Sequence, residues 1–214
     1  MDLVNIQILS DNYQLNYGVN SSVSCNITVK VTDLNDNPVN NYNVSVECPD
    51  DSSQTTRTGV TGANGVCNFT YTFSSGTGYR RFIVNNIKMI SVYLYRDTGW
   101  FDALTYTSGY ATKNDDVVKM RVVDKFVDIR GTYTNINAVT TPQNGTGLQV
   151  ATLKYPQFAP SNSVTAMMMN SPYKIYLELA SDGTLWMARR GNTATNTQIN
   201  ASAWLYCYMT YTID

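Results

Sequence analysis

The chain of 214 residues contains no histidine. Ser-His-Asp hydrolases, Cys-His peptidases and metal centres with histidine ligands all need an imidazole, so these classes are excluded. Glutamate is almost as scarce: Glu47 and Glu178 are the only two, and they fall in different halves of the chain. Glycoside hydrolysis uses a pair of carboxyl groups, whereas adjacent acids such as Asp115 and Asp116 point to opposite faces of a strand. We therefore expect a protein that is not an enzyme and has no catalytic residues.

Charged side chains are also few, at 14% of the residues against about 25% in an average soluble domain. The 15 Lys and Arg nearly cancel the 16 Asp and Glu, so the basic surface of a nucleic-acid-binding protein is not expected. No stretch approaches the roughly 18 apolar residues of a membrane helix, and residues 1–18 lack the cationic start of a signal peptide. The sequence thus predicts neither membrane insertion nor a nucleic-acid partner.

The four cysteines are not arranged in CxxC pairs, so zinc-ribbon spacing is absent. Cys25, Cys48, Cys67 and Cys207 each fall in phase with neighbouring apolar residues, which predicts small core side chains. A disulfide between two of the first three remains an alternative, and the sequence does not select a pairing.

Other polar groupings do not match binding motifs. Asp33, Asn35 and Asn37 have the spacing of a calcium loop, but Pro38 takes the place of the required glycine and Val44 that of the glutamate. We therefore expect no metal site and no cofactor. The basic pairs at 80–81 and 189–190 are interpreted as solvated strand ends.

Alternation of apolar and polar residues with a period of two dominates what is present, and no window has the pattern of a capped helix. The expected strands are 23–31, 42–48, 66–73, 79–84, 88–95, 100–107, 116–123, 126–135, 149–154, 163–169, 173–179, 185–189 and 203–213. Asn64-Gly65 and Asp182-Gly183 predict hairpin turns. Pro156 and Pro160 are expected to bracket an extended, non-helical stretch, and the methionines at 167–169 to form a buried strand.

The composition changes at 96–99, which we take as a domain junction. The prediction is an all-β protein in which residues 1–95 form an Ig-like β-sandwich and residues 96–214 a second antiparallel β-sandwich. Each is near the size at which a sandwich buries its own core.

Residues 20–85 resemble the bacterial Ig-like repeats of invasins and other surface and phage proteins. The motifs that carry the resemblance are Val29-Lys30-Val31-Thr32-Asp33, Asn37-Pro38-Val39, Val44-Ser45-Val46 and Thr61-Gly62-Ala63-Asn64-Gly65-Val66. Gly62 departs from the usual Asp of the last motif. The resemblance implies an Ig-like spacer.

Residues 99–212 resemble the tip domains of phage tail-fibre and baseplate receptor-binding proteins, with a jelly-roll-like sandwich as the implied fold. The ordered motifs are Gly99-Trp100, 127–131 (VDIRG), 153–160 (LKYPQFAP), 177–185 (LELASDGTL) and 209–212 (MTYT). The insertion of Lys154-Tyr155 before the first proline departs from the pattern. The resemblance implies attachment of a phage or archaeal-virus tail to a host cell-surface saccharide or protein, as a homotrimer assembled with other tail or baseplate subunits.

Outward-facing aromatic residues are the best candidates for recognition. Ile175, Leu177 and Leu179 would point inward, which places Tyr176 outward beside Glu178; the same alternation places Trp186, Tyr206 and Tyr208 outward. Such rings could bind a ligand or pack against another subunit or domain, so the binding residues are unknown from the sequence alone. Two other functions stay open: a cellular adhesin at the cell surface, and a purely structural virion component.

Overall fold

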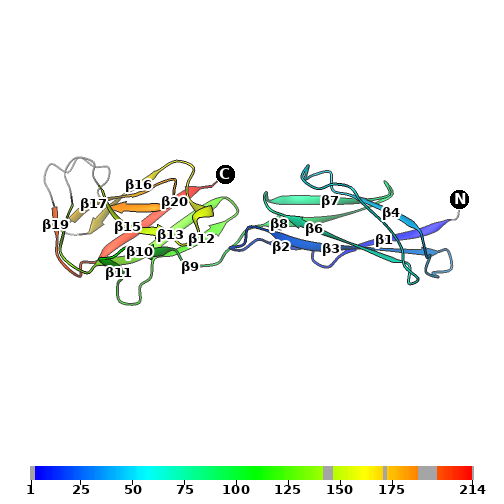
Figure 1. Ribbon diagram of the computed structural model, residues 1–214, viewed down its shortest axis with the longest axis horizontal. Helices are drawn as coiled ribbons and strands as arrows, with labels where there is room; N and C mark the ends of the chain where they lie inside the picture. Colours follow the sequence, from blue (N-terminus) through cyan, green and yellow to red (C-terminus); the bar gives the residue numbers. More distant parts are fainter. Residues whose placement is uncertain (1–2, 142–146, 171–172, 188–196, 214) are drawn as a thin grey trace. The chain divides into compact units, whose positions relative to one another are not determined.

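The computed structural model describes residues 3–141, 147–170, 173–187 and 197–213. This part of the chain is built almost entirely of strands, and the only helix in it is a single 3-10 turn, η1 (Pro156–Phe158), so the all-β prediction is confirmed. The chain divides into two compact units, Met1–Arg96 and Asp97–Asp214, called unit 1 and unit 2 below (Figure 1).

Unit 1 contains a three-stranded sheet with the order β1-β3-β6 and a five-stranded sheet with the order β2-β8-β7-β4-β5. All neighbouring strands are antiparallel except β2 and β8, which run parallel. The strands are β1 (Val4–Ser10), β2 (Gln14–Asn16), β3 (Val23–Asp33), β4 (Asn43–Glu47), β5 (Arg57–Val60), β6 (Val66–Phe73), β7 (Gly78–Val84) and β8 (Lys88–Tyr95).

The core of unit 1 follows from the alternation along these strands. On β3, Cys25, Ile27 and Val29 are buried, while the residues between them face outward. The buried Tyr71 of β6 donates a hydrogen bond from its hydroxyl to the carbonyl oxygen of Val46 on β4, at 2.8 Å. Because β6 and β4 belong to different sheets, this bond joins the two layers across an otherwise apolar core.

One predicted turn has a different role from the one expected. Gly65 does adopt a positive φ of 73°, and its N–H bonds to the carbonyl of Gly62 at 2.9 Å. However, β5 before the turn pairs with β4, and β6 after it pairs with β3. The Asn64-Gly65 turn therefore carries the chain from one sheet to the other, and the hairpin prediction is wrong because strand pairing is decided by the core.

Unit 2 has two five-stranded arrangements and a small ribbon. One sheet has the order β10-β15-β18-β17-β16, the other has β11, β13, β12 and β9 with β20 added along β13, and β14 pairs with β19. The strands are β9 (Phe101–Asp102), β10 (Leu104–Tyr106), β11 (Tyr110–Thr112), β12 (Lys119–Val123), β13 (Phe126–Asn135), β14 (Val139–Thr141), β15 (Leu148–Leu153), β16 (Val164–Asn170), β17 (Tyr173–Leu179), β18 (Thr184–Met187), β19 (Thr197–Ile199) and β20 (Leu205–Thr212).

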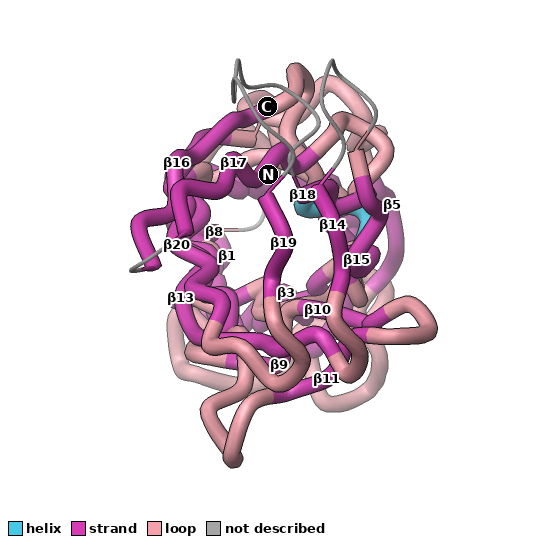
Figure 2. The backbone as a smooth tube through the Cα atoms, turned by 90° about the vertical axis from the view of Figure 1, so that its left-hand side faces the viewer, coloured by secondary structure: helices cyan, strands magenta, loops and turns pink. Residues whose placement is uncertain are grey.

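Strand β13 is the centre of the second sheet. One edge pairs with β20 over Phe126–Tyr133, and the other pairs first with β12 and then with β11. Between these two partners lies Gly131, whose φ is 143°. A Cβ at this position would lie 2.5 Å from the carbonyl oxygen of Val117, so only glycine lets the segment before β12 pass this close. Figure 2 shows β13 and β20 side by side, with β16 next to β20.

One turn and two segments of unit 2 had predicted conformations, and they agree with the structure to different degrees. Asp182-Gly183 forms the expected hairpin between β17 and β18, with φ 81° at Gly183. The stretch between Pro156 and Pro160 is not wholly extended, because η1 forms one 3-10 turn there and buries Phe158. Residues 167–169 lie in a strand as predicted, but Met167 is 55% exposed, so burial was wrong for this residue; the side chains of 168 and 169 lie outside the described residues.

Candidate functional site

The carboxyl groups considered for catalysis do not form a pair. Glu47 belongs to unit 1 and Glu178 to unit 2. Glu178 is only 1% exposed, so the prediction that it faces outward beside Tyr176 is wrong. Ile175, Leu177 and Leu179 point inward as expected, and the opposite face of β17 is therefore covered at Glu178, which a pattern along one strand does not reveal.

The loop with calcium-like spacing satisfies its own polar groups. Asp33 Oδ1 accepts the backbone N–H of Asn35 at 2.8 Å and that of Asn37 at 2.9 Å, and Oδ2 accepts the side-chain amide of Asn37. These bonds lower the pKa of Asp33, led by the Asn37 side chain. The carboxylate thus holds a turn, and the described part of the chain contains no group of three or more acidic or cysteine side chains able to hold a metal ion.

The cysteines are free thiols within the cores. Cys25, Cys48 and Cys207 are buried, as predicted, and Cys67 is half-buried. Of the basic pairs, Arg81 forms a salt bridge with Asp50 at 2.6 Å, while 189–190 lie outside the described residues. Within the described residues, neither the thiols nor the Arg81–Asp50 salt bridge forms a ligand site.

The outward aromatic residues fall into two groups. Tyr206 and Tyr208 on β20 are exposed, with Leu205, Cys207 and Met209 buried between and beside them, which confirms the predicted alternation. Tyr176 and Trp186 are half-buried, and Trp186 Nε1 donates to Thr184 Oγ1 at 2.7 Å. Of the aromatic residues predicted to face outward, the two exposed ones therefore lie on β20, which pairs with β13.

Strand register brings polar and aromatic side chains into rows on this outer face. Arg121, Asp128 and Thr210 lie opposite one another across β12, β13 and β20. The adjacent rows are Val123, Phe126 and Thr212 on one side, and Lys119, Arg130 and Tyr208 on the other. We call this the β12-β13-β20 face.

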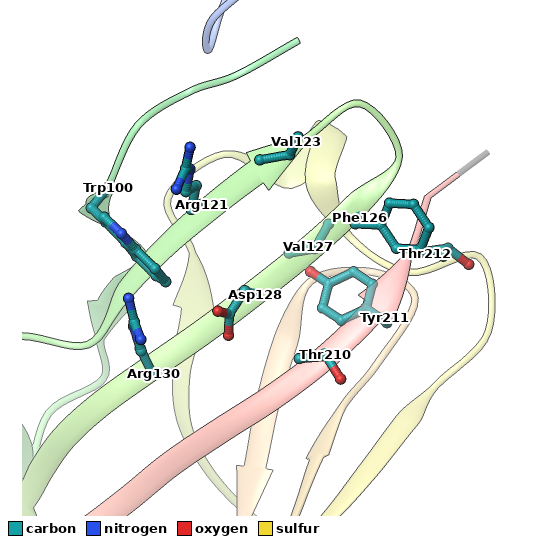
Figure 3. A pocket seen from close by; sticks show the side chains of 10 residues that line it. All are labelled: Trp100, Arg121, Val123, Phe126, Val127, Asp128, Arg130, Thr210, Tyr211 and Thr212. Atoms are coloured by element: carbon teal, nitrogen blue, oxygen red, sulfur yellow. The ribbon is translucent and has the colours of Figure 1, made fainter.

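A hollow of about 590 Å³ opens on this face. Trp100 forms one end and Phe126 the other, with Asp128 between them (Figure 3). The remaining lining residues are Arg121, Val123, Val127, Arg130, Thr210, Tyr211 and Thr212. A second hollow of about 410 Å³ shares Trp100 and Arg130 and extends toward Asp116 and Gly131.

Trp100 and Arg130 form the wall between the two hollows. The guanidinium carbon of Arg130 lies 3.8 Å from the centroid of the Trp100 ring, which is a close cation–π contact (Figure 3). No described residue accepts a hydrogen bond from this guanidinium. The stack therefore fixes the cation while leaving its N–H donors available.

Arg121 and Asp128 lie opposite each other on neighbouring strands, but only Arg121 has a hydrogen-bonding partner among the described residues. Arg121 makes a two-pronged salt bridge with Asp97, with Nη2 to Oδ2 at 2.7 Å and Nε to Oδ1 at 3.1 Å. This pairing lowers the pKa of Asp97 and raises that of Arg121. Asp128 receives no hydrogen bond from any described residue, and its Oδ1 is enclosed. An unpartnered carboxylate beside unused guanidinium donors gives the hollow both an acceptor and donors.

Sequence reasoning identifies Tyr206 and Tyr208 but not the residues of the hollow. Three residues of the hollow are named from the sequence only as members of the motifs of residues 99–212: Trp100, Asp128 and Arg130. The alternation of Asp128 and Arg130 with Val127 and Ile129 could have placed both on the outer face. Their proximity to Trp100 could not be predicted, because it depends on the path of the chain before β9.

A second aromatic surface occurs on unit 1 and was also missed. Tyr79 and Tyr93 are paired across β7 and β8 with ring centroids 4.9 Å apart, and Tyr93 stacks on Tyr95 at 6.2 Å. These rings line neither of the two hollows described above. The β12-β13-β20 face is therefore the better candidate site.

A comparison with protein families and with curated protein sequences finds no match to this chain. Among the described residues, no helix has the length and apolar character needed to cross a membrane.

Proposed function

We propose that this chain is a non-enzymatic attachment protein of a viral tail, from a fibre or baseplate of a phage or archaeal virus. Unit 2 binds a saccharide of the host cell surface, and unit 1 serves as an Ig-like spacer. The observation that carries the proposal is the hollow of the β12-β13-β20 face, which combines a tryptophan wall with unused donors on Arg130 and an unused acceptor on Asp128.

Saccharides are recognised by this combination of groups. A sugar ring offers C–H groups that pack on aromatic faces and hydroxyls that both donate and accept hydrogen bonds. Trp100, with Tyr206 and Tyr208 further along the face, supplies the aromatic surface. The motifs at 99–212 support a viral origin. Asp128 is the only carboxyl group among the described residues that line the larger hollow, whereas hydrolysis of a bound sugar uses a pair of carboxyl groups.

Single sites of this kind bind weakly, so we also propose that the chain acts as a homotrimer together with other tail or baseplate subunits. Three sites on one particle raise the effective affinity without any new contact. Mass measurement in solution at high protein concentration tests this part, and a strict monomer would contradict it.

The main experiment measures binding of the fluorescently labelled chain to intact bacterial and archaeal cells from a panel of candidate hosts, with soluble sugars as competitors. We expect saturable binding that sugars abolish and that Trp100→Ala weakens at least tenfold. Trp204→Ala is the matched control, because Trp204 is similarly exposed but lies outside both hollows. Binding that no sugar inhibits would indicate a protein receptor, and no binding to any envelope would favour a purely structural component. If the genes next to the one that encodes this chain include none for virion proteins, a cellular adhesin would be favoured.

A further inference from the structure

The polar groups of the larger hollow are ordered along one strand. Phe126, Asp128 and Arg130 follow each other on the outer face of β13, two residues apart. The hollow thus presents an apolar end, then an acceptor, then a donor, in one line (Figure 3).

The apolar end is formed by residues that meet across strands. Val123 lies directly opposite Phe126, which is 70% exposed, and Tyr211 completes this part of the lining. The Tyr211 hydroxyl donates to the carbonyl oxygen of Phe158 at 2.6 Å, so its polar atom is already engaged. Thr212, opposite Phe126 on β20, adds the one remaining hydroxyl here, and the two apolar side chains beside it make this end suited to a small apolar group of a ligand.

The middle of the hollow holds the carboxylate of Asp128, which can accept a hydrogen bond from a ligand. Asp128 receives no hydrogen bond from any described residue; its Oδ1 is enclosed, which leaves Oδ2 as the acceptor that a ligand can reach. Arg121, the cation opposite Asp128, is already engaged with Asp97.

The other side of Asp128 offers the reverse polarity. Arg130 is held over the Trp100 ring at 3.8 Å and makes no hydrogen bond to a described residue. Its N–H groups therefore suit a ligand oxygen two residues along the strand from the acceptor.

A secondary amide bearing a methyl group matches this order. Amides of this kind are planar and trans, which puts the N–H and the methyl group on one side and the carbonyl oxygen on the other. With the carbonyl toward Arg130, the N–H points to Asp128 and the methyl group to the Val123 and Phe126 end. We propose that the hollow recognises the acetamido group of an N-acetylated amino sugar, an inference that rests on the saccharide-binding function proposed above.

The test uses matched sugars that differ only at carbon 2. The full chain is titrated with the methyl glycosides of N-acetylglucosamine and N-acetylgalactosamine, and with their 2-amino and 2-hydroxyl counterparts, by NMR. We expect at least one acetamido sugar to bind ten times more tightly than both of its counterparts. Saturation transfer should be strongest at the acetyl methyl protons.

Variants locate the interaction. Asp128→Asn should lower affinity for the acetamido sugar roughly 10–100-fold, as expected for a hydrogen bond to a charged group. Asp102→Asn is the control, since Asp102 is an exposed acid of the same unit outside both hollows. Phe126→Ala removes an exposed ring without disturbing the core, and should reduce the preference for the acetamido over the 2-hydroxyl sugar at least threefold.

The possible results distinguish failure of the acetamido assignment from failure of the proposed saccharide-binding function. Equal binding of the 2-hydroxyl or 2-amino sugars, or an unaffected Asp128→Asn variant of native thermal stability, overturns the acetamido assignment and leaves saccharide binding standing. Cell binding that none of these sugars inhibits also overturns the assignment. Absence of both sugar and cell binding overturns the attachment function as well.

Discussion

Arg130 lies with its guanidinium carbon 3.8 Å from the centre of the Trp100 ring, and this contact separates the two hollows of the β12-β13-β20 face. A comparable pair elsewhere in unit 2, Lys113 and Trp204, is more open at 5.3 Å. The closer pair joins the segment before β9 to the central strand β13. It therefore shapes the proposed site as well as contributing to stability.

Replacing Trp100 by alanine should affect binding more than folding. Trp100 is 36% exposed, so the substitution removes buried ring surface as well as a cation–π contact of about 0.5–1 kcal/mol; the total of roughly 2 kcal/mol should lower the midpoint of thermal unfolding and leave the unit folded. Differential scanning calorimetry alongside cell binding checks this. Equal losses of stability in Trp100→Ala and Trp204→Ala, with binding retained in both, would contradict a specific role for Trp100.

Gly131→Ala should destabilise unit 2 by about 3 kcal/mol, because the new Cβ would meet the carbonyl oxygen of Val117 at 2.5 Å. Gly109→Ala is the matched control: Gly109 also has a positive φ, of 98°, but a Cβ added there would meet no atom within 4 Å, so only the backbone cost of about 1–2 kcal/mol applies. Urea unfolding of both variants gives the comparison. Similar losses for the two would mean that the close approach at Gly131 is not important.

Tyr71→Phe should lower the stability of unit 1 by about 1 kcal/mol, since it removes the hydroxyl that donates to Val46 and leaves that carbonyl without this partner. The ring remains, so the edge contact with Phe82 at 4.8 Å is preserved. Tyr79→Phe, at an exposed ring, should change stability by less than about 0.5 kcal/mol. A larger loss for Tyr79→Phe would refute this explanation.

Acid should weaken unit 1 through Asp50. The Arg81 guanidinium lowers the pKa of Asp50 from 3.8 to about 2, mainly through side-chain hydrogen bonds. A carboxyl group with a lowered native pKa stabilises the fold above its unfolded pKa, and this contribution is lost as the pH falls from about 4 to 2. The difference in unfolding free energy between the native chain and Asp50→Asn should therefore shrink over this interval. A difference that is constant with pH would exclude the mechanism.

Alkylation should distinguish the thiols. Burial raises the pKa of Cys25 and Cys207 to about 12 and that of Cys48 to about 11, and the thiolate is the reactive form. Iodoacetamide at pH 8 should therefore modify the half-buried Cys67 first, and the other three only after unfolding in guanidinium chloride. Peptide mass spectrometry identifies the sites. Rapid labelling of Cys207 in the folded chain would contradict its burial.

Much of the fold was predictable because the residues that form the core alternate with polar residues along each strand, with a period of two. The strands at β6, β8, β13 and β17 begin and end where the sequence indicated. The shorter strands β2, β5, β11, β14 and β19 were missed, since three or four residues do not establish a period. β1 could have been found, because Ile6 and Ile8 alternate with Asn5 and Gln7.

The site was predictable only in part, for a physical reason. Alternation decides which face a side chain is on, and it placed Tyr206 and Tyr208 correctly. It does not show what covers that face, so Glu178 was misplaced. Nor does it show the register that aligns Arg121, Asp128 and Thr210 on three strands.

The pairing of β13 with β20 joins segments made far apart in time during translation. A chain that stops before Leu205 lacks β20, and one long edge of β13 then exposes its backbone amides and carbonyls. Such an edge recruits other chains, so incomplete copies would be lost to aggregation or proteolysis. Because Tyr206 and Tyr208 lie on β20, a copy that lacks these two rings also lacks the strand that covers this edge of β13.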